Sequence, residues 1–274
     1  MKNMKKIAIA ATILITGKFA FAVGGDDDLK NFRFGLKVTP SVNWLKPEGK
    51  LISKNGAAVK YGGGIILEFK LAKVASVQTG LQIDTDGGKI KYNNNATNKA
   101  LYFYNNVDEK IVEYNLSDTS NANYTHYQLN ERKYNVTYVT LPISLKLKTK
   151  EIGALTYFGQ VGMNTSFRWK ANANDELSQV SNNANISKSK IDITKDINVI
   201  NFALNVGLGA EYNVSGSTSI LFGLNYAFGF SNVVKKESDY VNRKVTDAAG
   251  VVSNNPFPQK IKSNAIVLTV GVLF

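Results

Sequence analysis

The chain has 274 residues, with 33 Lys and Arg against 21 Asp and Glu, one His and no Cys. Without cysteine it has no disulfide, no thiolate nucleophile, no Cys-based metal site and no lipid-anchored N-terminal Cys. A single histidine, His126, argues against most soluble enzyme classes. We expect no cofactor and no metal.

The first 22 residues have the pattern of a secretory signal peptide. Lysines precede a short apolar run over 7–16, and Ala20-Phe21-Ala22 fits a cleavage site. A retained anchor is the alternative, but Lys18 interrupts the apolar segment. We therefore expect a cleaved leader over 1–22, a short linker over 23–30, and a mature domain over 31–274 with no membrane-spanning helix.

Strict alternation of bulky apolar and small or polar residues is the dominant pattern after the leader. In 217–230, Phe222, Leu224 and Tyr226 alternate with Gly223 and Asn225, and a period of two indicates a strand between two different environments. Eight segments show it: 31–45, 59–71, 74–85, 133–148, 154–169, 198–212, 217–230 and 262–274.

The length of these segments favours a membrane barrel. They run to about 12–15 residues, longer than the ~5–6 of ordinary strands and enough for a tilted bilayer crossing of about 9–11. The interior of an eight-stranded barrel holds only side chains, so the bulky faces must point outward to lipid. We predict an all-β fold, a closed eight-stranded antiparallel up-and-down transmembrane β-barrel.

One segment is irregular. In 133–148, Tyr134, Val136 and Tyr138 have the opposite phase to Val139 and the residues after it. This predicts a β-bulge, or the exit of the strand from the membrane, near Tyr138–Val139. Pro142 lacks a ladder donor and predicts a further local irregularity.

Short and long connections alternate along the chain. Outer-membrane barrels have short periplasmic turns and longer external loops, so we expect external loops at 46–58, 92–130, 171–196 and 231–260. In this topology Trp44 and Trp169 form an aromatic girdle at the outer lipid boundary, and Tyr212 and Phe274 form one at the inner boundary.

The run Tyr138-Val139-Thr140-Leu141-Pro142-Ile143-Ser144-Leu145-Lys146 resembles the PorT-like outer-membrane β-barrel family of Bacteroidetes-type bacteria. The runs 157–162, 207–212, 222–232 and 271–274 resemble it too, and the likeness covers about 31–274 except 92–130 and 171–196. The resemblance implies a barrel fold and, for the namesake, a role in protein export across the outer membrane. The terminal Phe274 resembles the signal that barrel-assembly machinery recognises.

Charged residues on the small-residue faces should point into the lumen and pair there, because unpaired buried charges are costly. We expect a polar network, and favour an ion-pair plug over a conducting path with anion preference. Its members are Arg33, Lys37, Lys60, Glu68, Lys70, Asp84, Lys146, Lys148, Arg168 and Glu211.

Two further features bear on function. His126 lies among aromatic and amide residues, and we interpret it as a solvated loop histidine rather than a catalytic base. The first long connection carries Lys46, Lys50, Lys54 and Lys60 against Glu48, which suggests a basic rim that touches lipopolysaccharide phosphates.

We therefore expect a non-enzymatic protein of a Gram-negative outer membrane, with a structural or interaction role and an accessory part in protein export. The alternatives are a small solute channel and a lipid-modifying enzyme. Expected partners are outer-membrane lipid and lipopolysaccharide, the barrel-assembly machinery during insertion, and an envelope or secretion protein. Export removes the chain from nucleic acid, which we do not expect it to bind.

Overall fold

The computed structural model describes residues 32–113 and 123–274. The expected leader, 1–22, and linker, 23–30, lie outside the described residues and stay predictions. No helix in the described ranges is long and apolar enough to cross a membrane.

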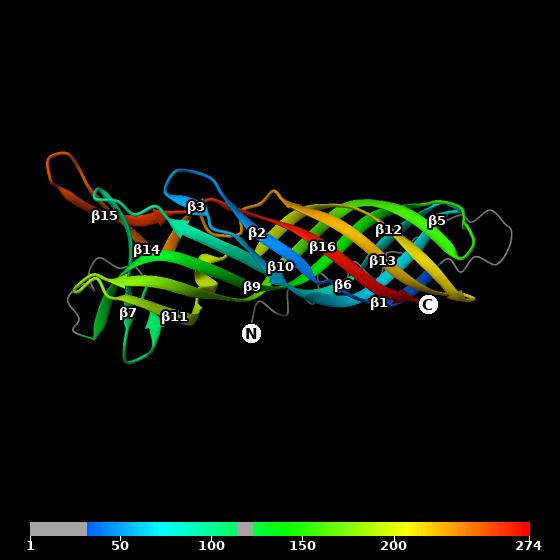
Figure 1. Ribbon diagram of the computed structural model, residues 1–274, viewed down its shortest axis with the longest axis horizontal. Helices are drawn as coiled ribbons and strands as arrows, with labels where there is room; N and C mark the ends of the chain where they lie inside the picture. The colour runs from blue at the N-terminus through cyan, green and yellow to red at the C-terminus, as the bar shows by residue number, and fades with distance from the viewer. Residues whose placement is uncertain (1–31, 114–122) are drawn as a thin grey trace, which may run out of the picture. The chain divides into compact units, whose positions relative to one another are not determined.

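Eight antiparallel strands pair in a closed ring (Figure 1). The ring is built from β1 (Phe32–Val38), β2 (Ser41–Pro47), β4 (Ala57–Lys60), β5 (Gly62–Ala72), β6 (Ala75–Tyr92), β9 (Tyr124–Lys148), β10 (Leu155–Gln179), β12 (Ile200–Ser215), β13 (Thr218–Gly229) and β16 (Ile261–Leu273). Two of the eight ring strands are interrupted once each: β1 and β2 form one, and β4 and β5 form another. The ring closes because β16 pairs with β1 and β2, and β9 pairs with both β6 and β10. This confirms the predicted eight-stranded all-β fold, and each alternating segment corresponds to one strand.

The interruption between β1 and β2 has a local cause. Pro40 has no N–H group and cannot donate to the ladder, although its carbonyl still accepts a hydrogen bond from the Leu268 N–H at 2.9 Å. Thr39 and Gly62 bridge the gap by exchanging two backbone hydrogen bonds, of 2.8 and 3.2 Å.

The apolar phase reversal in β9 marks a change of surroundings, not a change of side-chain direction. The alternate residues Arg132, Tyr134, Tyr138 and Lys146 are all buried on the same inner face of β9. The extra residue lies in the partner strand: the β9–β10 register shifts between Arg168 and Lys170, opposite Tyr138. The irregularity is thus at the predicted place, but the bulged residue belongs to β10.

The segments expected to be loops contain further strands. They are β3 (Ile52–Lys54), β7 (Asn98–Asn105), β8 (Lys110–Ile111), β11 (Asn185–Asp192), β14 (Glu237–Thr246) and β15 (Val252–Pro258), with the 3-10 turn η2 (Thr194–Asp196). We call these elements, with the halves of β6, β9 and β10 that pair with them, the head. Figure 1 shows β7, β11, β14 and β15 gathered at one end of β9 and β10, opposite the end where the C-terminus lies.

A separate hydrophobic core explains why these segments are ordered. Tyr92, Tyr102, Tyr134 and Tyr138 are nearly or fully buried there, and every head strand contributes at least one side chain to the same core; β3 contributes Ile52 and β15 contributes Phe257. The expectation of loops without regular structure was therefore wrong for most of 92–130, 171–196 and 231–260, while their external location stays a prediction. Their abundant Asn and Lys hid the periodic tyrosines and isoleucines that form this core.

Candidate functional site in the barrel lumen

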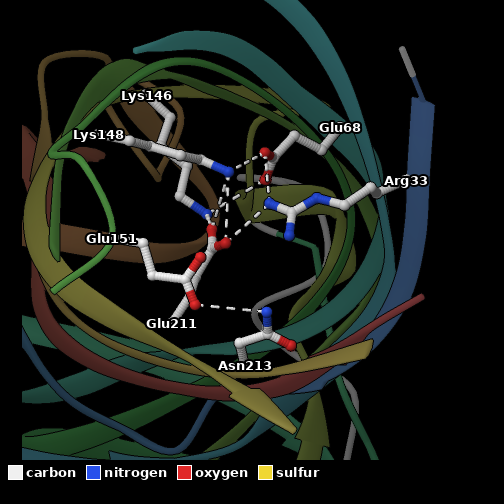
Figure 2. Close-up of polar contacts among 7 residues, drawn as sticks. All are labelled: Arg33, Glu68, Lys146, Lys148, Glu151, Glu211 and Asn213. Carbon is white, nitrogen blue, oxygen red and sulfur yellow. Dashed lines mark hydrogen bonds and ion pairs between the residues drawn. The ribbon is translucent and has the colours of Figure 1, made fainter. Parts of the chain in front are cut away.

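Five of the ten charged residues expected in the lumen meet at the end of the barrel that carries the short turns. They are Arg33 on β1, Glu68 on β5, Lys146 and Lys148 on β9, and Glu211 on β12 (Figure 2). Strand alternation turns all five side chains inward, and the register places Arg33 directly opposite Glu68.

The two carboxylates hold the three cations together. Arg33 Nη2 donates to Glu68 Oε1 at 2.7 Å and to Glu211 Oε2 at 2.8 Å. Lys146 Nζ donates to Glu68 Oε2 at 3.2 Å and also bonds Glu211. Lys148 Nζ bonds Glu68 and lies 3.1 Å from Glu211 Oε1. Each carboxylate therefore contacts all three cations, and the five groups form one network, which we call the charge cluster.

Burial makes this cluster stable only as a unit. The Lys146 side chain is fully buried, and its Nζ lies 4.1 Å from the ring centroid of Phe158. That ring belongs to a small apolar cluster with Ile66, Leu221 and Leu273. Removing an ion from water costs several kcal/mol, and only good geometry with a partner offsets this cost. Loss of any one partner would therefore leave an unpaired buried charge and destabilise the barrel.

Above the charge cluster the lumen holds a cavity of about 110 Å³ lined mostly by hydroxyl and amide side chains. The hydroxyl oxygens of Thr140 and Ser166, which are paired between β9 and β10, lie 2.9 Å apart in its wall, and Asn225 Nδ2 donates to Thr269 Oγ1 at 3.1 Å. A polar cavity of this size holds a few water molecules. It offers hydrogen bonds but little room for a solute.

The other five predicted lumen residues are spread along the barrel. Lys37 and Asp84 line the cavity. Lys60 is buried near the head and donates to a carbonyl and an amide of two consecutive β9 residues. Arg168 donates to two carbonyl groups around η2. Lys70 is half-buried near the short turns. The structure thus brings together five of the ten, not all of them.

The sequence reasoning missed a fully buried ion pair in the head. Arg132 Nε and Nη2 donate to the two carboxylate oxygens of Asp175 at 2.7 and 2.6 Å, and both side chains are fully buried. Burial alone lowers the pKa of Arg132, but the charge and hydrogen bonds of Asp175 hold it well above its usual range. The available signal was Arg132 itself, two residues before Tyr134 and in the same phase.

His126 lies on β9, not in a solvated loop, so that interpretation was wrong. Its ring stacks on Phe103 with centroids 4.2 Å apart, because the two residues are directly paired between β9 and β7. Burial, with a smaller effect of the Lys244 charge, lowers its pKa. Among the hydrogen bonds and ion pairs of the described ranges, none joins His126 to a carboxylate that would orient it as a base.

A comparison with family models now identifies the chain. The model described as "Outer membrane protein beta-barrel domain" matches residues 20–235, well over half of the sequence. The chain belongs to this family.

Solved structures of outer-membrane proteins also resemble this outer-membrane barrel. OprG from Pseudomonas aeruginosa is 10% identical with a TM-score of 0.39, covering 89% of this chain and 95% of that one. Neisserial surface protein A is 8% identical with a TM-score of 0.36, covering 90% and 99%. Ail of Yersinia pestis is 9% identical with a TM-score of 0.34, covering 89% and 99%. Scores this low carry no argument about function. None of the curated proteins matches the sequence.

The surface of the outer-membrane barrel carries an apolar belt where lipid is expected. Bulky residues on every ring strand point outward, such as Phe34, Leu208, Phe222 and Leu268. Of the four expected girdle residues, Trp169 is 66% exposed, and Tyr212 and Phe274 are also exposed. Trp44 is partly covered, with its ring 6.2 Å from that of Tyr226. Their role as a girdle stays a prediction.

The basic rim expected in the first long connection needs one correction. Lys60 is only 6% exposed and points inward, so it is not available to an external phosphate. It lies in β4, where alternation turns it to the same side as the buried Ala58. Lys46, Lys50 and Lys54 are not buried.

Proposed function

We propose that this outer-membrane barrel is a non-enzymatic interaction protein of a Gram-negative envelope, which displays the head outside the cell. The observation that carries the proposal is the head itself: four long connections build one β-structure with its own core. Ordering so many residues costs conformational entropy, which is offset here by burial of tyrosine, isoleucine and leucine side chains. Short turns at the opposite end favour the outward orientation of the head.

The lumen supports an interaction role over transport. The charge cluster fills the barrel at the short-turn end, and the head core covers the other end with the buried rings of Tyr134 and Tyr138. Between them lies the small polar cavity. A solute path would require both regions to open. We infer that the lumen is sealed and that the barrel serves as an anchor.

The PorT-like resemblance suggests where such an anchor works. We propose that the protein is a PorT-like accessory of protein export, whose head contacts an envelope or secretion protein. Its expected route is export by the leader, cleavage, and insertion by the barrel-assembly machinery, for which the C-terminal Phe274 is the expected signal.

Site-specific photocrosslinking in intact cells tests the interaction role. A photoreactive residue replaces Val107 or Val251, which are 71% and 62% exposed in the head. The matched control is Ile152, which is 64% exposed at the short-turn end. We expect the same protein adduct from both head positions and a different pattern from Ile152. Absence of head adducts, together with steady single-channel current in planar bilayers, would favour the solute channel instead.

A further inference from the structure

The outer surface beside Trp44 combines an aromatic ring with several lysines at the upper edge of the apolar belt. We call this surface the Trp44 rim; its residues are Trp44, Lys46, Glu48, Lys54, Lys260 and Lys262. Four lysines and one carboxylate give it a strong positive excess.

Strand register builds the rim. Leu45 is fully buried and Asn43 nearly so, so alternation along β2 turns Trp44 and Lys46 outward. Lys46 is paired directly with Lys262 of β16. Like charges directly opposite each other on one face of a sheet are destabilising. Glu48 offsets the charge of Lys262, and an external anion at Lys46 would reduce the remaining repulsion.

The rim is only partly neutralised by the protein. Glu48 forms ion pairs with Lys260 and Lys262, and its Oε1 lies 2.8 Å from the Lys262 Nζ. Hydrogen bonds from these two lysines lower the pKa of Glu48 to about 2, so it stays ionised at neutral pH. Lys46 and Lys54 have no ion pair with any acidic residue in the described part of the chain. Lys54 instead places its Nζ 5.2 Å from the Trp44 ring centroid.

The position of the rim determines which anion it meets. Val42 lies two residues before Trp44 on the same face of β2. It is exposed and paired with the exposed Ile266, and both residues belong to the apolar belt. Acyl chains on this belt would end beside the Trp44 ring if Trp44 lies at the lipid–water boundary, as expected of aromatic girdle residues. A phosphate on the same lipid would then be within reach of the lysines.

From this arrangement we infer that the Trp44 rim is a binding site for the phosphate group of a phosphorylated glycolipid in the outer leaflet. Lys46 and Lys54 contact the phosphate, the Trp44 ring lies against the sugar or the upper acyl carbons, and Glu48 limits the affinity by holding the other two lysines. The inference rests on the proposed orientation of the head and names the lipid partner of the barrel.

Fluorescence of Trp44 provides a direct assay. The chain has two tryptophans, so Trp169→Phe leaves Trp44 as the sole reporter. The purified full-length barrel in detergent is titrated with lipid A that carries both phosphates, and separately with the same lipid after removal of its phosphates. We expect a saturable change in Trp44 emission with the phosphorylated lipid at much lower concentration.

Variants of opposite sign make the test specific. Lys46→Gln with Lys54→Gln should weaken binding about tenfold, which corresponds to ~1.4 kcal/mol. Glu48→Gln releases two lysines and should strengthen binding severalfold. Lys99→Gln with Lys110→Gln, which removes the same charge from exposed head positions, should change nothing.

Three results would overturn the inference. They are an equal response to the dephosphorylated lipid, unchanged binding in the Lys46 and Lys54 variant, and competition by inorganic phosphate at the concentration at which the lipid binds. The last would indicate a site for free phosphate. If the double variant misfolds, the gain expected from Glu48→Gln decides alone. Head crosslinks that persist while phosphate preference fails would reject the lipid site and leave the proposed function standing.

Discussion

The buried ion pair in the head allows a sharp test of what holds the head together. Arg132 and Asp175 form two parallel hydrogen bonds with no exposure of either side chain, and Arg132 also lies 5.9 Å from the Tyr134 ring centroid. Asp175→Asn keeps the shape of the side chain but removes its charge. Arg132 then remains buried with no carboxylate to pair with.

The expected cost follows from the burial. Removing one partner of a buried pair typically costs about 3–5 kcal/mol, because an uncompensated charge is left in the core. That cost raises the population of the opened head by roughly two to three and a half powers of ten. Replacing both residues, by Arg132→Met with Asp175→Leu, should be neutral or even stabilising by about 1–4 kcal/mol.

Hydrogen exchange followed by mass spectrometry measures this opening in the folded barrel. Backbone amide hydrogens in the head halves of β9 and β10 should exchange much faster in Asp175→Asn. The halves of the same strands that lie in the apolar belt serve as an internal reference. Lys235→Gln is the control, because its partly exposed pair with Asp239 is worth about 0–1 kcal/mol. The reasoning would be refuted if the head of Asp175→Asn exchanged no faster than that of this control. It would also be refuted if the double variant exchanged as fast as Asp175→Asn.

Three further predictions concern pH, the lumen and strand packing. Burial raises the pKa of Asp196 above its ordinary 3.8. The folded head then binds this proton more tightly than the unfolded head, and its free energy of unfolding falls as pH rises above 3.8. Asp196→Asn should remove this contribution to the pH dependence, which hydrogen exchange of the head at acidic and at neutral pH will measure. Glu68→Gln with Glu211→Gln leaves three cations in the lumen without a carboxylate, so we expect poor assembly and an anion-selective leak; a reversal potential showing cation preference would contradict this. A Cβ at Gly209 would lie 2.1 Å from a carbonyl oxygen of the neighbouring strand, so Gly209→Ala should destabilise the barrel by about 1–3 kcal/mol. A Cβ at its cross-strand partner Gly223 would lie 3.6 Å from the nearest side-chain atoms, an ordinary contact distance. Gly223→Ala should therefore fold normally, and unfolding in denaturant will compare the two variants.

These predictions differ in how far the sequence alone supports them. The pairing of Glu68 and Glu211 with inward-facing cations could be expected, because alternation fixes which face each residue occupies. Which charges meet could not, because that depends on strand register and tilt. Lys60 and Arg168 have the same alternation as Lys146, yet they lie far along the barrel and bond backbone carbonyls.

The sequence by itself determined the number of strands, their antiparallel order and the outward-facing residues. Eight segments alternate over a bilayer length, and strands that cross a membrane must close into a barrel to pair all their backbone groups. Only the tertiary structure decided the head. Its core joins Tyr92, Tyr134 and Ile193 from segments far apart in the chain, and its ion pair joins Arg132 to Asp175. Such contacts arise from strand pairing beyond the apolar belt. Each short segment there carries only a few apolar residues, which do not indicate a strand by themselves and become buried only when the neighbouring segments cover them.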